Sequence, residues 1–182
     1  MDSITMTKRI AGIAVFAALA FVVSLLEFPI FPAASFLKLD FSSVFTLLAG
    51  FIYGPVSGVA VCAVKELLCV AKSSTGGVGE LANFIVTVIF IIIPTVVYHF
   101  RKGFGTVAIT LAVGCVIEVF AALIANRFIN FPLYMGGNME VVINMFAKLW
   151  PYIIFFNLIK TVAVSIITIL LYKKVSSLIK KI

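Results

Sequence analysis

Three polar side chains interrupt the apolar runs in the second half of the sequence. Lys160 and Asn157 lie three residues apart in the last long apolar run, so on a helix they share one face. Asn126 stands near the end of the apolar run before it. Burying a lysine at the centre of a bilayer costs about 3 kcal/mol on insertion scales, and an intramembrane charge therefore indicates a functional site. Amide groups beside an ammonium suit a flat ligand that has alternating carbonyl and N–H groups along one edge.

A structural role is the alternative for this lysine. Glu118 lies in the middle of the preceding apolar run, and an ion pair between Glu118 and Lys160 would steady a helix bundle without contacting a ligand. The 18 phenylalanines can supply apolar or stacking walls for a site. Most of them are expected to face lipid or to fill the core.

The segment Ser74–Phe84 (STGGVGELANF) is polar and glycine-rich, whereas the sequence on both sides is apolar. Its glycines allow positive φ and close approach to the backbone. Glu80 would stand in the first turn of the next helix, where a negative charge favours the positive end of the helix dipole. Two interpretations are open: a flexible turn between two membrane helices, or a ligand-facing loop at a helix N-terminus.

The composition places these segments in a membrane. The 182 residues are 63% hydrophobic and 12% charged, with a mean hydropathy of +1.25, whereas soluble domains are about 45–50% apolar. The sequence therefore predicts an all-α integral membrane protein with one domain over residues 1–182. Six transmembrane helices are expected, over residues 7–26, 43–53, 56–72, 79–98, 105–128 and 151–172. Residues 141–150 form either an interfacial helix or the start of the last span.

The positive charges predict how the chain crosses the membrane. With six spans, both termini lie on the same side. Lys8, Arg9, Arg101, Lys102, Lys173, Lys174, Lys180 and Lys181 fall on that side, and Lys38, Lys72, Arg127 and Lys148 fall on the other. Because cytoplasmic loops carry the excess of lysine and arginine, both termini are predicted to be cytoplasmic. The polar loops around residues 39, 77 and 134 then face outward.

Several functional classes find no support in the sequence. The net charge of +7 is carried in the gaps between apolar runs, which indicates the anionic leaflet of a lipid bilayer rather than nucleic acid as the partner. The sequence has no GxxxxGK[ST] motif, no HExxH motif and a single histidine, so no catalytic constellation, metal or cofactor is indicated. The three cysteines lie inside apolar runs and are expected to fill core space.

Small residues recur along the first apolar run. Ala14 and Ala18 form a small-xxx-small pair, which lets another helix approach closely in lipid. The pair would serve either internal packing or the docking of a separate membrane subunit, and the sequence alone barely separates these interpretations.

Four motifs come in an order and spacing that resembles the riboflavin-specific S-components of energy-coupling factor (ECF) vitamin transporters. They are LDFS (Leu39–Ser42), FIYGPVSG (Phe51–Gly58), STGGVGELANF (Ser74–Phe84) and FNLIK (Phe156–Lys160). The resemblance covers nearly the whole chain. It implies a bacterial plasma-membrane protein with six helices that binds riboflavin, its transported ligand, from outside and does not hydrolyse ATP. It also implies partnership with an ECF module, made of a transmembrane T-component and two cytoplasmic ATPases, which docks at Ala14 and Ala18.

Carried over to matching positions, the resemblance implies which residues form the riboflavin site. These are Leu39, Asp40, Phe41, Gly79, Glu80, Asn83, Asn126, Asn157 and Lys160. The reasoning from the residues agrees for the last three, because the imide edge of an uncharged flavin requires an amide and a cation. Asp40 and Glu80 would accept hydrogen bonds from the ribityl hydroxyls, or would cap helices.

Two other functions are weighed against this one. A stand-alone secondary transporter of a vitamin or related small molecule would need a coupling residue, for which Glu118 is the best candidate. An integral membrane enzyme would convert a bound ligand through Glu80 or Lys160, but the sequence offers no catalytic constellation to support it.

Overall fold

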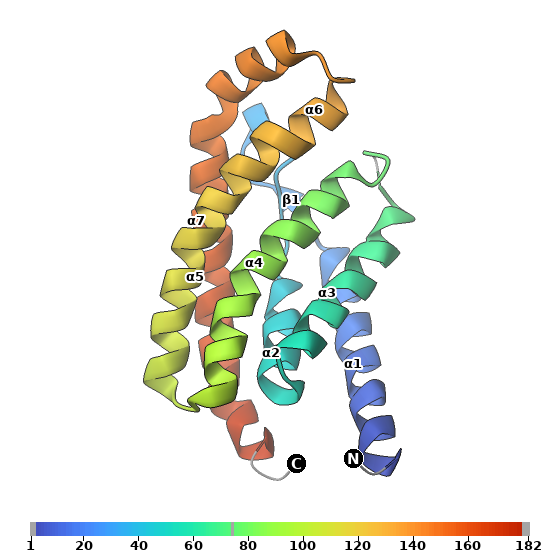
Figure 1. Ribbon diagram of the computed structural model, residues 1–182, viewed down its shortest axis with the longest axis vertical. Helices are drawn as coiled ribbons and strands as arrows, with labels where there is room; N and C mark the ends of the chain where they lie inside the picture. Colours follow the sequence, from blue (N-terminus) through green and yellow to red (C-terminus); the bar gives the residue numbers. More distant parts are fainter. Residues whose placement is uncertain (1–2, 74, 180–182) are drawn as a thin grey trace.

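Apolar helices make up most of the computed structural model, which describes residues 3–73 and 75–179 (Figure 1). Ser74, Lys180 and Lys181, which the sequence analysis used, lie outside the described residues. The helices are α1 (Ser3–Ser24), α2 (Ser43–Tyr53), α3 (Pro55–Val70), α4 (Val78–Phe100), α5 (Phe104–Ala125), α6 (Phe131–Tyr134) and α7 (Met139–Ile179). A short hairpin of β1 (Phe28–Pro29) and β2 (Lys38–Leu39) encloses the 3₁₀ turn η1 (Pro32–Ala34). The prediction of an all-α chain is confirmed apart from this hairpin.

Four stretches of helix in the described part of the chain are long and apolar enough to cross a bilayer. They cover residues 6–24, 78–100, 104–134 and 139–172. α2 has 11 residues and α3 has 16, whereas crossing the hydrocarbon core takes about 20 helical residues. The chain is therefore a multi-pass membrane protein with two further helices that are shorter than an ordinary span.

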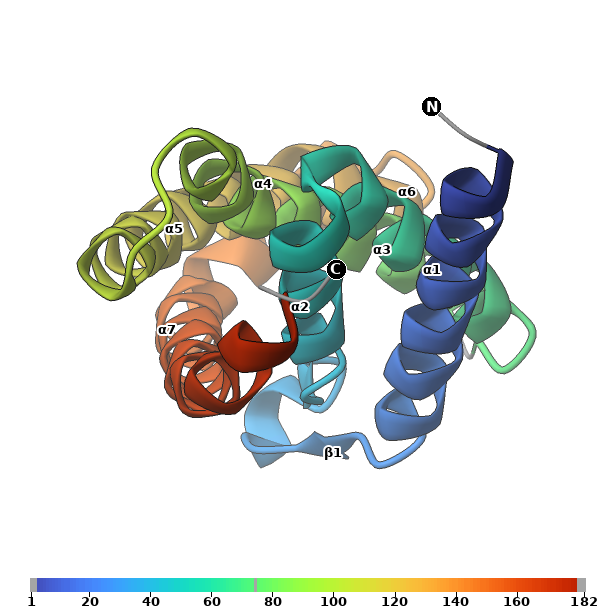
Figure 2. The same ribbon diagram turned by 90° about the horizontal axis from the view of Figure 1, so that it is seen from below.

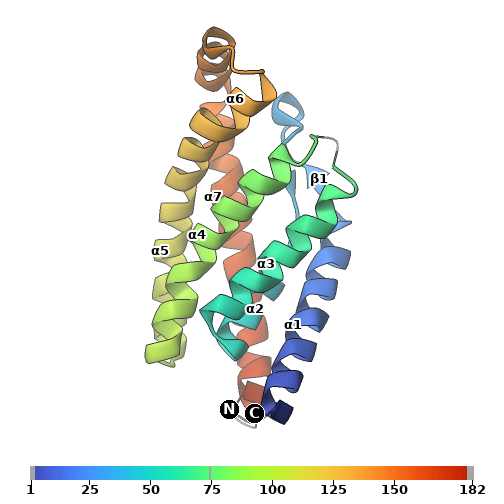
Figure 3. The ribbon, with the colours of Figure 1, turned by 45° about the vertical axis from the view of Figure 1, so that its right-hand side comes forward.

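α2 and α3 form a tightly packed helical hairpin. Gly54 makes the turn with φ of 95°, which favours glycine, and Pro55 begins α3 (Figure 3). Two glycines bring the helices together: a Cβ on Gly58 would lie 3.1 Å from the Cα of Gly50 and 3.0 Å from the carbonyl oxygen of Thr46. The hairpin turns at the end of the bundle where the termini lie, so the far end of α3 reaches the loops at the opposite end (Figure 1).

The last helix is longer than the sequence predicts. α7 contains Pro151 and extends back to Met139 without a break, so residues 141–150 are the start of the last helix, and the expected start at residue 151 is wrong. The helix is not straight: its first turns run at an angle across the end of the bundle, whereas the rest runs along it (Figure 1). These first turns carry Val142, Met145 and Phe146 on their inner face, where they pack in the core cluster that also contains Phe131 of α6.

α1 lies at the edge of the bundle, against α2 and α3 (Figure 2). Ala17 and Ala20 pack into the interior, at 2% and 0% exposure. Ala14 and Ala18 lie on an adjoining side of the helix and are exposed. Internal packing of the Ala14–Ala18 pair is therefore excluded within this chain, and the pair is available to another helix.

An apolar core fills the end of the bundle near the termini. Phe51, Tyr98 and Tyr172, from α2, α4 and α7, form a cluster of edge-to-face rings with centroids 4.9–6.1 Å apart. The hydroxyls of Tyr98 and Tyr172 are hydrogen-bonded at 2.9 Å. This core closes the interior on the side where α1 begins and α7 ends, and it leaves the polar residues to the opposite end.

Candidate ligand-binding site

A cavity of about 540 Å³ lies among the β1–β2 hairpin, the facing ends of α3 and α4, the first half of α7, and the segment from the end of α5 to α6. Its volume is within the range of about 300–1,000 Å³ usual for small-molecule sites. Seven of the residues expected at the site line it: Asp40, Gly79, Glu80, Asn83, Asn126, Asn157 and Lys160. Leu39 and Phe41 pack instead into the core behind the hairpin, so the structure does not bring them to the cavity wall.

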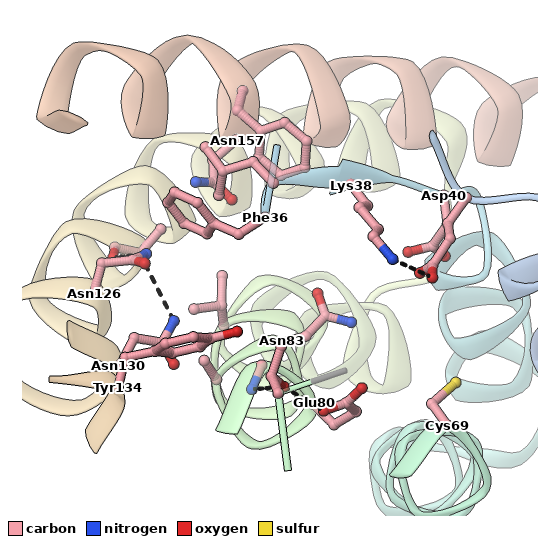
Figure 4. Close-up of a pocket in the computed structure, with 18 of the residues that line it drawn as sticks. Phe36, Lys38, Asp40, Cys69, Glu80, Asn83, Asn126, Asn130, Tyr134 and Asn157 are labelled. Carbon is pink, nitrogen blue, oxygen red and sulfur yellow. Dashed lines mark hydrogen bonds and ion pairs between the residues drawn. The ribbon is translucent and has the colours of Figure 1, made fainter. Parts of the chain in front are cut away.

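The two ends of the cavity differ in chemistry (Figure 4). Amide and aromatic side chains gather at one end, where Phe36 and Tyr134 lie near Asn126, Asn130 and Asn157. Carboxylates, lysines and the thiol of Cys69 line the other end. The lining as a whole is electrically balanced, because the four acids Glu27, Asp40, Glu66 and Glu80 face the four lysines Lys38, Lys65, Lys72 and Lys160.

The amides at the first end are held by bonds within their own helices. Asn126 Nδ2 donates to the carbonyl of Ala122, and Asn157 Nδ2 donates to that of Ile153, each at 2.8 Å. Asn130 Nδ2 donates to Asn126 Oδ1 at 3.1 Å. The π-helical turn η2 (Asn126–Asn130), a distortion often found at functional sites, carries two of these amides. Asn130 was not anticipated from the sequence, since the π-helical turn that places it has no sequence signal in the motifs.

Lys160 is buried at 6% exposure and binds two other site residues. Its Nζ donates to Asn83 Oδ1 at 2.8 Å and lies 3.7 Å from Asp40 Oδ2. The alternative pairing with Glu118 is wrong in this structure, because Asp40 is the ion-pair partner. Glu118 is buried at 3% exposure, and among the described residues its Oε2 has no hydrogen-bond partner.

Asp40 follows β2 directly, and the hairpin therefore fixes its position. Its Oδ1 accepts a hydrogen bond from the backbone N–H of Ser42 at 2.8 Å. Burial raises the pKa of Asp40, but the positive charges of Lys160 and Lys65 and the hydrogen bonds from Ser42 outweigh it and lower the pKa from 3.8 to about 2. Asp40 is thus a carboxylate at neutral pH despite its burial.

Lys65 and Glu66 of α3 also line the cavity, although the sequence analysis did not assign them to the site. Their side chains form an ion pair, Nζ to Oε1 at 2.8 Å, at 4% and 6% exposure. The feature of the sequence that could have pointed to these two residues is a pair of adjacent opposite charges inside an apolar run. Adjacent residues point about 100° apart on a helix, and long side chains span that angle here.

The glycine-rich loop is held together by its own side chains. Glu80 Oε2 accepts from Ser73 Oγ at 2.7 Å and from Thr75 Oγ1 at 3.2 Å. Thr75 Oγ1 in turn accepts the N–H of Gly79 at 3.0 Å. Gly77, with φ of 92°, provides the left-handed residue that begins α4. Thr75, Gly79 and Glu80 line the cavity, and part of the hydrogen-bonding capacity of Glu80 is used within the loop.

These features define a class: a multi-pass helical membrane protein with a charge-balanced polar cavity at the end of the bundle opposite its termini. The family model for the substrate-specific component of ECF transporters matches residues 8–172. The chain belongs to this family, and it is a transporter component rather than an enzyme.

Relatives and a solved structure agree with this assignment. The riboflavin transporter RibU of Staphylococcus aureus (strain TCH60) is 34% identical over 177 residues, covering 96% of this chain and 94% of the relative. The riboflavin transporter FmnP of Bacillus subtilis (strain 168) is 28% identical over 184 residues, covering 96% and 95%. A solved S component of a bacterial ECF transporter superposes with a TM-score of 0.80 at 33% identity, covering 96% of this chain and 99% of that one.

Proposed function

We propose that this protein is the riboflavin-binding subunit of an ATP-driven ECF importer in a bacterial plasma membrane. The observation that carries the proposal is the cavity itself. It is charge-balanced, large enough for a small molecule, and has amides and aromatic rings at one end with charged groups at the other. The two relatives described above are both named riboflavin transporters, which supports the same ligand.

The flat ring of riboflavin fits the amide end. Its imide edge alternates carbonyl, N–H and carbonyl, and needs both donors and an acceptor. Asn157 donates an amide N–H to the carbonyl of Ile153, and its side-chain oxygen can accept a hydrogen bond from the imide N–H. Lys160 has three N–H donors, of which one is used by Asn83, so it can also donate to a ring carbonyl. Phe36 and Tyr134 offer aromatic faces beside the ring.

The ribityl chain then extends toward the charged end. Its hydroxyls both donate and accept, so they can satisfy carboxylates and lysines without bringing a charge into a balanced cavity. Asp40 keeps an oxygen for this purpose beside its bond from Ser42, and Glu80 keeps its Oε1. Gly79 brings backbone close to the ligand, whereas Leu39 and Phe41 support the hairpin from behind.

The proposed topology has six crossings, made by α1 to α5 and α7, and the short helix α2 makes one of them. Both termini are cytoplasmic and the cavity opens outward. This is supported because the chain ends lie at one end of the bundle (Figure 1), whereas the residues that line the cavity lie toward the other. Transport then depends on an ECF module of one T-component and two ATPases, for which the exposed Ala14 and Ala18 on α1 are the proposed contact.

An absorbance spectrum tests the ligand. Protein purified in mild detergent from cells grown with riboflavin should be yellow, with flavin bands near one flavin per chain. In proteoliposomes the protein alone should bind riboflavin without accumulating it. A colourless protein that leaves added riboflavin fluorescence unquenched would refute the ligand, and unaided uphill uptake would refute dependence on an ATPase.

A further inference from the structure

Four charged side chains are buried together at the cavity floor, which is unusual in so apolar a protein. Lys65, Glu66, Asp40 and Lys160 are each 4–6% exposed. Removing such groups from water costs several kcal/mol per ion, so a buried cluster is weak evidence for stability alone. Two of the four belong to the proposed riboflavin site. The role of Lys65 and Glu66 is the open question.

A continuous chain of hydrogen bonds connects α3 to the ligand-facing lysine. Lys65 Nζ binds Glu66 Oε1 at 2.8 Å. Asn83 Nδ2 donates to the same Glu66 oxygen. On its other side, Asn83 Oδ1 accepts from Lys160 Nζ at 2.8 Å. The chain therefore joins α3, α4 and α7, with the side chain of Asn83 as its central member.

Only one orientation of the Asn83 side-chain amide satisfies this series of hydrogen bonds. An ionised carboxylate only accepts hydrogen bonds, and an ammonium only donates them. Asn83 must therefore turn its NH₂ group to Glu66 and its oxygen to Lys160. If Glu66 were absent, Lys160 would still face the amide oxygen, but the NH₂ group would lose its acceptor and Asn83 would be held on one side only.

We infer that Glu66, held by Lys65, is a positioning residue for riboflavin binding that acts through Asn83 on Lys160. This inference rests on the proposed function. Asn83 is thereby a bridge between two charged partners, and Lys160 is held by its hydrogen bond to Asn83 and its ion pair with Asp40.

A double-mutant cycle on riboflavin affinity tests this role, with affinity measured by fluorescence quenching in detergent. Glu66→Ala should weaken binding about ten- to hundredfold, the range for losing a hydrogen bond to a charged group. Glu66→Gln keeps an acceptor oxygen and should recover most of the loss. In an Asn83→Ala background, Glu66→Ala should add less than about threefold, because both changes break the same path. Glu140→Ala, at an exposed carboxylate of α7, is the control and should bind as the wild type does.

Two results would overturn the inference. One is a folded Glu66→Ala protein with wild-type affinity and a lowered Tm, which is what a purely structural ion pair predicts. The other is full additivity of the Glu66 and Asn83 effects. If Glu66→Ala does not fold, Lys65→Met combined with Glu66→Leu removes both charges together and should weaken binding to the same extent; wild-type affinity would again overturn it.

Failure of the proposed function is distinguishable from failure of this inference. A wild-type protein that binds no riboflavin refutes the ligand. The positioning role is then measured in the ligand-free protein as the rate at which acetic anhydride acetylates Lys160, followed by mass spectrometry. Glu66→Ala should raise that rate by releasing the amine, and an unchanged rate would overturn the inference.

Discussion

Individual side chains at the cavity already have part of their hydrogen bonding satisfied, which decides what each can offer a ligand. Asn157 and Asn126 are anchored to backbone carbonyls one turn earlier, so their rotamers are set before any ligand binds. Such preorganisation lowers the entropy cost of binding. Asn83 is satisfied on both sides and has the least to offer directly.

Truncating the two α7 residues should therefore weaken riboflavin binding directly. We expect Lys160→Ala and Asn157→Ala each to cost about 1–3 kcal/mol, since each removes a buried polar partner of the ligand. Fluorescence quenching of riboflavin measures the effect. Asn144→Ala, an exposed amide on the same helix, should leave affinity unchanged. Equal losses in all three variants would mean that the assay reports damage to α7 rather than ligand contacts.

The carboxyl group of Asp40 predicts a pH dependence of stability. Its pKa is lowered in the folded protein, from 3.8 to about 2, so the folded state is stabilised when the group is ionised. The stabilisation, about 2 kcal/mol, is fully present above pH of about 4 and is lost as the pH falls toward 2. The difference in Tm between wild type and Asp40→Asn should narrow across that window. A constant difference would contradict the pairing with Lys160.

Residue types identified much of the site before the structure did. An ammonium and amides inside apolar runs cannot be left unpaired in lipid, and Lys160, Asn157 and Asn126 do line one cavity. The partners were harder to predict. Lys160 binds Asp40 and Asn83 rather than Glu118 because the hairpin brings Asp40 over the end of the bundle, and that contact depends on tertiary structure.

At the scale of elements, the six apolar runs were readable from hydropathy but their ends were not. The sequence left residues 141–150 as either an interfacial helix or the start of the last span, and α7 includes them because its first turns pack residues such as Val142 into the core that contains Phe131 of α6. The π-helical turn after α5 likewise left no trace in the periodicity. Both irregularities lie beside the cavity, where local sequence preference is overridden to place side chains.

Where two helices touch at a glycine, a larger side chain at that position should destabilise the fold. A Cβ on Gly50 of α2 would lie 2.4 Å from Cγ2 of Thr95 on α4, and Thr95 is buried with its hydroxyl bonded to the carbonyl of Ile91. Gly50→Ala should therefore destabilise the fold by about 1–3 kcal/mol through overpacking. The change is measured as a lowered Tm in detergent.

Gly105 on α5 provides the matched control for this substitution. A Cβ there meets nothing within 4 Å, so Gly105→Ala should keep or raise the Tm, because alanine favours helix. An unchanged Tm for Gly50→Ala would show that the α2–α4 contact is looser than described, and a lowered Tm for Gly105→Ala would show that alanine destabilises the protein without overpacking.

At the scale of the whole molecule, the ligand cavity and the apolar core occupy opposite ends of the bundle. The core around Phe51, Tyr98 and Tyr172 fills the interior between the cavity and the end where the termini lie. A ligand in the cavity therefore has a packed core beneath it. Delivery to the other side of the membrane requires movement of the bundle as a unit or its disassembly, and the first of these keeps the core intact.

Movement as a unit would require a partner bound to the outside of the bundle, and the exposed face of α1 is the proposed contact. Ala14 and Ala18 are exposed, and small residues permit the close helix approach that drives association in lipid. Replacing both with leucine should leave riboflavin affinity unchanged, since neither residue lines the cavity. ATP-dependent uptake by proteoliposomes that contain the ECF module should be lost.

Ala112→Leu, at an exposed alanine of α5, makes the same change in side-chain volume on another face and should retain uptake. Uptake that survives leucine at both α1 positions would place the partner elsewhere on the bundle. Loss of riboflavin binding in the α1 variant would mean that its exposed face is needed to maintain the cavity, because α1 contacts α3, whose far end lines the site. Affinity and uptake should be measured on the same preparations, because a loss of docking lowers uptake but leaves riboflavin affinity unchanged.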